Sequence, residues 1–348
     1  MNMFMSCIKF KSFIIFLNFL LLPSVIFSHH STSEFDRSVV TEVRGKIINM
    51  LWKNPHVMFE VETVEGDPNS IWLAEGGSIS GQRRRGVTAD NVKVGDIISL
   101  AGNPSTRRNN VMVLTSMLLS NGVEVPLTRN ATPRWPDAGK FTPEAPPTNA
   151  STEEESDFYR VWSWGFKERG WWFFGGPENF PLTDKAISLA AQWNEYEDNL
   201  QQECIAPGMP NTMGNPYPIE FIEHENYIEL KAEEFDVTRT IYLEEQNQDS
   251  ILPSPLGHSI GKWVDINTLE IVTTKINYPY FNRVGVSQTT DVKTFERFTL
   301  NNSEGRLYYE LIVEDSETLT EPFTWDAFWI WNSEEVRGIY DCTLYEEV

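Results

Sequence analysis

From residue 218 onward, short runs of alternating apolar and polar residues follow one another along the chain. Turn sequences such as Asn301-Asn302-Ser303-Glu304-Gly305 separate several of these runs. Alternation with a period of two is typical of half-buried β-strands. The expected strands are 219–223, 227–232, 238–243, 259–264, 269–276, 294–300, 307–313, 323–331 and 339–345. So many strands with short connections predict an antiparallel β-barrel or sandwich.

One helix is expected just before this strand-rich region. Thr183 suits an N-cap, and Ala186, Ala190 and Trp193 fall on one face of a helix that extends to Leu200. The sequence Ala206-Pro207-Gly208 then ends it.

The first part of the chain also has a strand pattern, with Gly45 as a bend or bulge. Residues 78–92 lack that pattern and have room for a short helix. The expected strands are 39–50, 56–64, 70–75, 97–102, 111–119 and 123–127. Five or six strands with one helical insert favour a small closed barrel of the oligonucleotide/oligosaccharide-binding (OB) type. The fold class predicted for the chain is therefore mainly β, with an OB-like barrel followed by an antiparallel barrel or sandwich and one helix preceding it.

Charge divides the chain into two halves. Residues 29–135 carry 12 basic and 11 acidic residues, whereas residues 136–348 carry 14 basic and 39 acidic residues. Proline-rich and then acidic sequence between them is typical of a linker. We therefore expect an OB-like domain at 29–130, a linker at 131–157 and an acidic domain at 158–348. The overall charge of −22 argues against general nucleic-acid binding, which needs clustered basic residues.

The first 28 residues resemble a secretory signal peptide. Lys9 and Lys11 precede an apolar run that ends at Leu22, and cleavage is expected after Ser28. A retained transmembrane anchor is the alternative, but the run is short for a span and Asn18 interrupts it. The expected location is periplasmic or secreted, with no membrane span after cleavage.

Cleavage would leave two cysteines, Cys204 and Cys342. An even number in an oxidising compartment predicts a disulfide, with two buried free thiols as the alternative.

Several short motifs resemble a family of exported bacterial proteins of unknown function. They are His29-His30-Ser31 with Phe35, Gly45-Lys46-Ile47, Asn54-Pro55-His56 and Trp72-Leu73-Ala74-Glu75, in that order. The resemblance covers roughly residues 29–127, and it implies export without implying an activity.

The histidines suggest a copper site. An N-terminal His29 would offer its α-amine and imidazole to Cu(II), and His30 or His56 could supply another nitrogen. Glu75 could add an oxygen or orient a ring. The alternative is that these histidines are solvated or cap a turn.

Two basic clusters, Arg83-Arg84-Arg85 and Arg107-Arg108, stand out in the first half. We expect them to be solvated or to form ion pairs with the acidic second domain, in preference to binding a polyanion.

Aromatic residues in the second half permit a ligand pocket. Trp325, Phe328 and Trp329 could line a barrel mouth, although such residues also serve as core packing. The acidic pairs Glu233-Glu234, Glu244-Glu245 and Glu314-Asp315 raise the alternatives of a glycosidase or a calcium site. Neighbouring carboxylates on a strand point to opposite faces and do not converge, so we expect these pairs at solvated edges and turns.

The sequence therefore favours an exported, non-catalytic binding protein whose partner is a small molecule, an envelope component or another protein. The alternatives are a copper-binding protein and a hydrolase whose site is assembled from distant residues. The familiar sequence motifs of serine hydrolases, zinc proteases and phosphate-binding loops do not occur.

Overall fold

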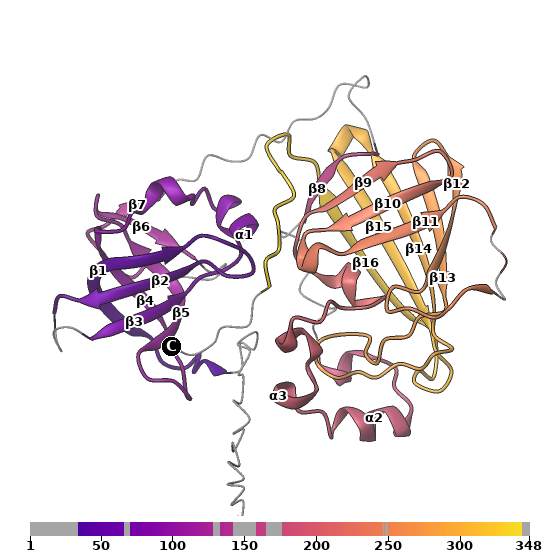
Figure 1. Ribbon diagram of the computed structural model, residues 1–348, viewed down its shortest axis with the longest axis horizontal. Coiled ribbons are helices and arrows are strands. Elements are labelled where there is room, and N and C mark those ends of the chain that lie inside the picture. Colours follow the sequence, from indigo (N-terminus) through magenta and orange to yellow (C-terminus); the bar gives the residue numbers. More distant parts are fainter. Residues whose placement is uncertain are drawn as a thin grey trace, which may run out of the picture.

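The computed structural model of the 348-residue chain describes residues 34–65, 70–127, 133–141, 158–164, 176–245, 247 and 250–342. These residues form two β-barrels that lie side by side, with a C-terminal segment running between them (Figure 1). The expected signal peptide, residues 1–28, lies outside the described residues.

The first barrel has five strands. They are β1 (Thr41–Leu51), β2 (Met58–Thr63), β3 (Ile71–Glu75), β4 (Ile97–Pro104) and β5 (Val111–Leu118). The sheet order is β3-β2-β1-β4-β5, and a parallel pairing between β3 and β5 closes it. A short helix, α1 (Ile79–Arg83), lies between the third and fourth strands. This arrangement confirms the prediction of a small OB-like barrel.

Gly45 has a different role from the one predicted. It continues the β1 ladder, and the irregular register lies further on, between Ile47 and Asn49. A Cβ atom at Gly45 would lie 2.4 Å from Val61 Cγ1 and 2.5 Å from the Glu62 carbonyl oxygen. Glycine is therefore needed for the close approach of β2 and not for a bend.

Part of the expected linker belongs to the first barrel. Strand β6 (Val123–Pro126) pairs with β5, and β7 (Gly139–Lys140) pairs with β6. The Arg134 guanidinium and the Trp135 indole both donate hydrogen bonds to Glu42 on β1. The described residues 133–141 thus pack on the barrel, and residues 142–157 lie outside the described residues.

The second barrel has nine strands. They are β8 (Val161–Trp164), β9 (Ile219–Glu223), β10 (Tyr227–Ala232), β11 (Thr238–Tyr242), β12 (His258–Asp265), β13 (Thr268–Thr274), β14 (Lys293–Asn301), β15 (Arg306–Glu314) and β16 (Phe323–Ile330). The closed order is β10-β11-β12-β13-β14-β15-β16-β8-β9. All neighbours are antiparallel except β11 and β12, which run parallel. The predicted barrel is confirmed, with one parallel pair added.

Aromatic side chains fill this barrel. Phe158, just before β8, packs edge-on against Phe221 at 4.7 Å between ring centroids. Phe298 packs edge-on against Phe221 at 5.2 Å and lies tilted against Tyr309 at 4.7 Å, again between ring centroids. Rings on strands far apart in sequence therefore meet in one buried core, which is why a four-residue strand such as β8 can close the barrel.

The predicted helix before the second barrel is broken into shorter pieces. Thr183 is its N-cap as expected, but α2 (Asp184–Ala190) is followed by α3 (Glu195–Asp198) and a 3₁₀ turn, Leu200–Glu203. The side chains of Asn194 and Asn199 each accept a hydrogen bond from the backbone N–H two residues later. Each of these side chains caps the start of a new helical turn, so the expected single helix is divided into α2, α3 and the 3₁₀ turn.

The strand predicted at 339–345 is wrong. Its described residues form no strand and instead belong to a segment between the barrels, residues 332–342, which we call the strap. Side chains satisfy its backbone: Glu233 accepts from the Gly338 N–H, Asp236 accepts from the Tyr340 N–H, and Asn54 donates to the Ile339 carbonyl. Tyr340 is buried against Tyr217 and Phe235 while Ile339 is exposed, so the apolar residues of this segment do not reflect a place in a sheet.

Candidate functional site

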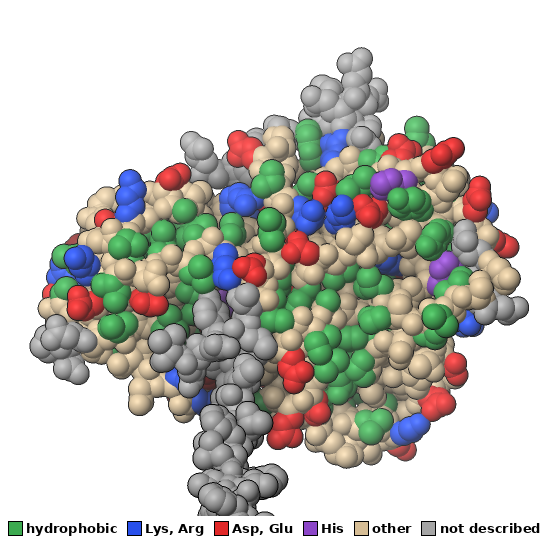
Figure 2. All heavy atoms as spheres, in the orientation of Figure 1, with side chains coloured by type: hydrophobic (Ala, Val, Ile, Leu, Met, Phe, Trp, Pro, Cys, Tyr) green, Lys and Arg blue, Asp and Glu red, His purple; other side chains and the backbone are tan. Residues whose placement is uncertain are grey.

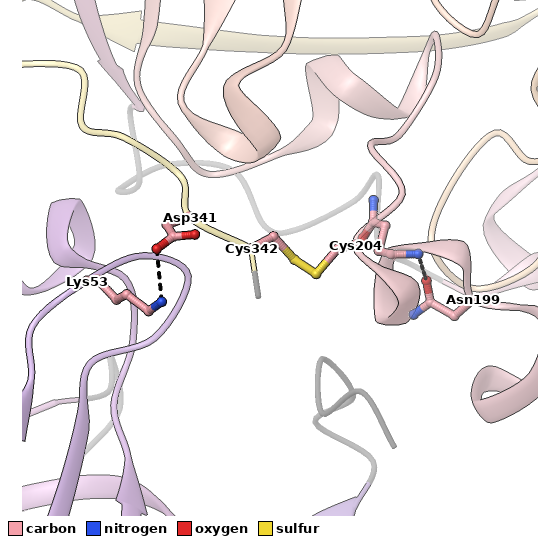
Figure 3. The surroundings of a disulfide bond; sticks show 6 residues. Lys53, Asn199, Cys204, Asp341 and Cys342 are labelled. Carbon is pink, nitrogen blue, oxygen red and sulfur yellow. Dashed lines mark hydrogen bonds and ion pairs between the residues drawn. A yellow bond between two sulfur atoms is a disulfide. The ribbon is translucent and has the colours of Figure 1, made fainter. Parts of the chain in front are cut away.

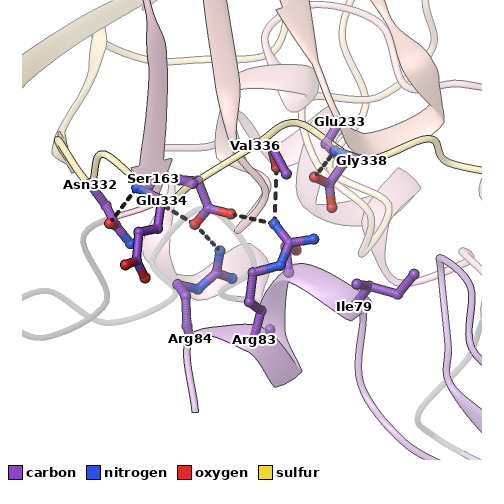
Figure 4. A network of polar contacts seen from close by, with 12 residues as sticks. Ile79, Arg83, Arg84, Ser163, Glu233, Asn332, Glu334, Val336 and Gly338 are labelled. Atoms are coloured by element: carbon purple, nitrogen blue, oxygen red, sulfur yellow. Dashed lines mark hydrogen bonds and ion pairs between the residues drawn. The ribbon is translucent and has the colours of Figure 1, made fainter. Parts of the chain in front are cut away.

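The strap joins the two barrels through buried charges. Helix α1 of the first barrel presents Arg83 and the adjacent Arg84 to Glu335, at 3.3 and 3.8 Å between nitrogen and oxygen (Figure 4). The Glu335 side chain is only 1% exposed, and Ser163 of β8 donates a hydrogen bond to its second oxygen. Arg83 also donates to the Val336 carbonyl at 3.2 Å. The predicted ion-pair contact between the Arg83-Arg84-Arg85 cluster and the acidic domain is confirmed.

The second basic cluster contributes one contact of its own. The Arg107 guanidinium lies 3.7 Å from the ring centroid of Tyr196 in α3, a cation–π contact between the two halves. Arg108 instead pairs with Glu34 near the start of the described chain. On the face shown in Figure 2, basic and acidic side chains meet along the line where the barrels join.

Asn54 connects both barrels and the strap through one fully buried amide. Its Nδ2 donates to Glu233 Oε1 at 3.0 Å and to the Ile339 carbonyl at 3.2 Å, and its Oδ1 accepts from the Ile79 N–H at 2.9 Å. A Cβ atom on Gly338 would lie 3.2 Å from this amide, so the strap passes close by because it has glycine there. A fully hydrogen-bonded amide in this position fixes how the barrels dock.

A disulfide joins Cys204 to Cys342, with 5.6 Å between their Cα atoms, and confirms the predicted pairing (Figure 3). Next to it, Lys53 of the first barrel pairs with Asp341 at 3.0 Å. The bond closes a loop across 138 positions of sequence, worth about 4–5 kcal/mol in the chain-entropy model. It fixes the end of the strap to the segment that follows α3.

Beside the strap lies a buried polar group that we call the Glu234 cluster: Asn215, Tyr217, Glu234, Tyr278, Arg283 and Tyr340. Glu234 is 3% exposed and its Oε1 accepts from Arg283 Nη2 at 3.1 Å. The same Nη2 donates to Asn215 Oδ1 at 2.5 Å. Glu234 Oε2 and Asn215 Nδ2 are buried and have no hydrogen-bond partner in the described part of the chain.

Three tyrosines of the cluster lie near the Glu234–Arg283 ion pair. Tyr217 and Tyr340 are hydrogen-bonded to each other, with their ring centroids 5.5 Å apart, and Phe235 lies 4.8 Å from Tyr340. Burial raises the pKa of both phenols, and it raises the pKa of Tyr278 to about 12. Burial likewise raises the pKa of Glu234 to about 7, although Arg283 opposes the shift. The cluster thus holds protonated phenols and one carboxyl group that exchanges its proton near neutral pH.

The sequence prediction for Glu233-Glu234 is wrong, because both side chains are buried and not solvated. They lie in a 3₁₀ turn and not on a strand, and Phe235 within it has φ of +56°. This turn lets Glu233 face Asn54 and Gly338 while Glu234 faces Arg283. The exposed pair Glu244-Glu245 matches the prediction, whereas Asp315 of the third pair is buried and accepts from the Thr289 N–H.

The aromatic residues proposed for a ligand pocket do not line one surface. Trp325 and Trp329 are buried inside the second barrel, where both contact Trp164. Phe328 lies between them in β16 and faces the other side, under the Arg306 guanidinium at 4.5 Å. Trp325 and Trp329 therefore serve the core.

The structure brings together two of the four proposed metal ligands. His56 Nδ1 lies 3.1 Å from Glu75 Oε1 and 3.1 Å from the Gly76 carbonyl oxygen. His29 and His30 lie outside the described residues. Within the described ranges, no three His, Cys, Asp or Glu side chains group in a way that could hold a metal ion.

Residues 20–113 match the model of a family of unknown function (DUF6152), in agreement with the resemblance seen in the sequence motifs. The search of curated proteins found no match. Among the described residues, no helix has the length and apolar character needed to cross a membrane.

We predict that Glu335→Gln destabilises the protein by about 3–5 kcal/mol, because it leaves the buried Arg84 guanidinium without its carboxylate. Urea denaturation measures the change. Glu317→Gln is the matched control, since Glu317 pairs with Lys185 on the surface, and it should leave the free energy of unfolding nearly unchanged. Equal effects of the two substitutions would contradict the role given to Glu335.

A second prediction concerns pH. Glu234 has a pKa of about 7 when folded and 4.5 as its ordinary value, so the folded state holds the proton more tightly. Its contribution to stability is full below pH 4.5 and is lost as the pH rises through 7, a change of about 3 kcal/mol. Unfolding free energies of Glu234→Gln should therefore fall less between pH 5 and pH 8 than those of the unsubstituted protein. The control Glu244→Gln changes an exposed residue, and its unfolding free energy should fall as much as that of the unsubstituted protein. The same pH dependence of the unfolding free energy in all three proteins would contradict the raised pKa of Glu234.

Proposed function

We propose that this chain is an exported, non-catalytic binding protein that takes a small, neutral, polar molecule at the Glu234 cluster. The observation that carries the proposal is the pair of buried atoms without partners, Glu234 Oε2 and Asn215 Nδ2, which belong to side chains held by the same Arg283 nitrogen. Buried polar groups are almost always hydrogen-bonded, and an unpaired one costs about 1–3 kcal/mol. A ligand that pairs with both atoms would recover that energy.

Charge and chemistry favour binding over catalysis. Arg283 compensates the charge of Glu234 when Glu234 is ionised, so in that state the cluster has no net charge to attract an ion. A hydrolase would need a nucleophile or a second carboxylate facing the acid. The groups that act on Glu234 and its pair are an arginine, an asparagine and tyrosines whose raised pKa values keep them protonated. The neighbouring Glu233 faces Asn54 and Gly338 instead.

The other buried ion pair in the second barrel is a poorer candidate. Arg239 donates to Ser259, Thr273 and Glu296, and Glu296 also accepts from the Tyr309 hydroxyl. These five side chains therefore provide hydrogen-bond partners for one another and form a structural network inside the barrel.

Export is supported by the sequence of residues 1–28 and by the resemblance to exported proteins. A disulfide is also characteristic of an oxidising compartment such as the periplasm.

Thermal unfolding in the presence of neutral sugars, polyols and amides tests the binding function. At least one compound should raise the Tm of the unsubstituted protein and of Glu244→Gln, since a ligand at 100 times its Kd adds about 2.7 kcal/mol. The same compound should leave the Tm of Glu234→Ala unchanged, with circular dichroism showing that this variant is folded. The proposal fails when no compound shifts the unsubstituted protein, or when Glu234→Ala responds equally.

A second candidate function is Cu(II) binding by the processed N-terminus. Arg108 holds Glu34 through two hydrogen bonds of 2.6 and 3.0 Å, and both act electrostatically on Glu75, which contacts His56. His30 precedes Glu34 by four residues in the sequence. The first described residue, Glu34, therefore lies within electrostatic range of the Glu75 carboxylate that contacts His56.

Titration calorimetry with Cu(II) on protein processed after Ser28 tests this candidate. Binding tighter than micromolar is expected, with at least about a tenfold loss in His56→Ala because one of the nitrogen ligands is removed. His224→Ala is the control, since His224 stacks on Tyr227 in the second barrel. Absence of binding at micromolar Cu(II) would exclude the candidate.

A further inference from the structure

We propose that Glu234 and Asn215 recognise the edge of a planar amide, an N–H group beside a C=O group, as found in cyclic imides, lactams and pyrimidine bases. The inference rests on the proposed binding function and specifies the chemical class of the ligand.

The donor and acceptor arrangement supports this class. The first oxygen of each side chain contacts one nitrogen, Arg283 Nη2, so the two planar head groups lie next to each other. The atoms left over are an acceptor, Glu234 Oε2, and a donor, Asn215 Nδ2. An acceptor next to a donor is the complement of an amide edge, whose N–H would reach the carboxylate while its C=O accepts from the Asn215 amide.

The elements that carry these groups make the arrangement rigid. Glu234 lies in a 3₁₀ turn between β10 and β11, and Asn215 follows another 3₁₀ turn, Asn211–Gly214. Arg283 comes from the connection between β13 and β14 and reaches both. A site that presents buried polar atoms in a fixed order discriminates strongly, because a ligand without the matching group leaves them unpaired.

Aromatic rings beside the pair suit a flat ligand. The ring centroid of Tyr340 lies 5.5 Å from that of Tyr217 and 4.8 Å from that of Phe235. Planar rings stack on such side chains at little conformational cost. Tyr340 belongs to the strap, so the strap contributes one aromatic side chain to the cluster.

The charges of Arg283 and Glu234 narrow the chemical class of the ligand further. An ammonium ligand would compete with Arg283, which already neutralises Glu234, and an anion would face the Glu234 carboxylate. A neutral amide avoids both costs. The charged and titratable groups that face Glu234 are Arg283, Tyr217, Tyr278 and Tyr340, and the tyrosines titrate far above neutral pH. Glu234 is therefore the group whose proton would compete with the N–H of the ligand.

Titration calorimetry with glutarimide, N-methylglutarimide and glucose on the full, disulfide-bonded chain tests the inference. Glutarimide should bind, and N-methylation should weaken binding at least about tenfold because it removes the N–H that Glu234 accepts. Affinity for glutarimide should fall about fivefold from pH 7 to pH 6 in the unsubstituted protein, because the ionised fraction of Glu234 falls by that factor, and it should be independent of pH in Glu234→Gln.

Asn215→Asp replaces the donor with an acceptor and should also lose at least about tenfold in affinity for glutarimide. Asn226→Asp makes the same change at an exposed turn and should bind as the unsubstituted protein does. Should Asn215→Asp fail to fold, the N-methyl comparison on the unsubstituted protein still decides the question.

The outcomes separate the two proposals. Equal binding of glutarimide and N-methylglutarimide, or binding of glucose alone with sensitivity to Glu234→Ala, would overturn the amide inference and leave the binding function in place. When neither these probes nor the wider set of neutral compounds binds, both proposals fail.

Discussion

The buried charge of Glu335 is the interaction on which the assembly of this protein depends. A carboxylate that is 1% exposed carries a large desolvation cost, which only well-placed cations and hydrogen bonds offset. Arg83 and Arg84 come from the first barrel and Ser163 from the second, so both barrels must be in position before the charge is compensated. Asn54 also requires both barrels to be in position, because its amide donates hydrogen bonds to Glu233 of the second barrel and to the Ile339 carbonyl of the strap. The barrels are therefore docked in one orientation, and the Glu234 cluster lies next to the strap that joins them.

The strand pattern predicts most of the fold because both barrels have one face against a core and one toward solvent. The bounds of β9 (Ile219–Glu223) and β10 (Tyr227–Ala232) agree with the alternation residue for residue. The secondary structure predicted from the sequence is wrong in two segments, where contacts outside the sheets or local caps determine the backbone. In the segment from Ile339, Tyr340 packs on two aromatic rings and Cys342 forms a disulfide, so these residues are held without a strand partner. The helix after Thr183 is interrupted because Asn194 and Asn199 cap new turns.

The Glu234 cluster was not visible in the sequence for a physical reason. Asn215 and Arg283 are 68 positions apart, and nothing in their local sequence indicates that one nitrogen will bond both Asn215 and Glu234. The pair Glu233-Glu234 was assigned to solvent because neighbours on a strand diverge, yet the left-handed backbone at Phe235 turns both inward. By contrast, the number of cysteines predicted the disulfide. The charge difference between the halves predicted an ion-pair contact for the Arg83-Arg84-Arg85 cluster, although it did not identify Glu335 as the partner.

The strap follows both barrels in the sequence, and this position affects the order in which the protein can assemble. Residues 332–342 follow every strand of both barrels, so each barrel can close while the surface that will join them is still open. Until the strap docks, Arg83 and Arg84 lack the Glu335 carboxylate, and Glu233 lacks the hydrogen bond from the Gly338 N–H. The arrival of the strap then buries these groups together, and the bond between Cys342 and Cys204 makes the step covalent. A shortened chain that ends before the strap would consist of two complete barrels with complementary charges and no means of shielding them from water.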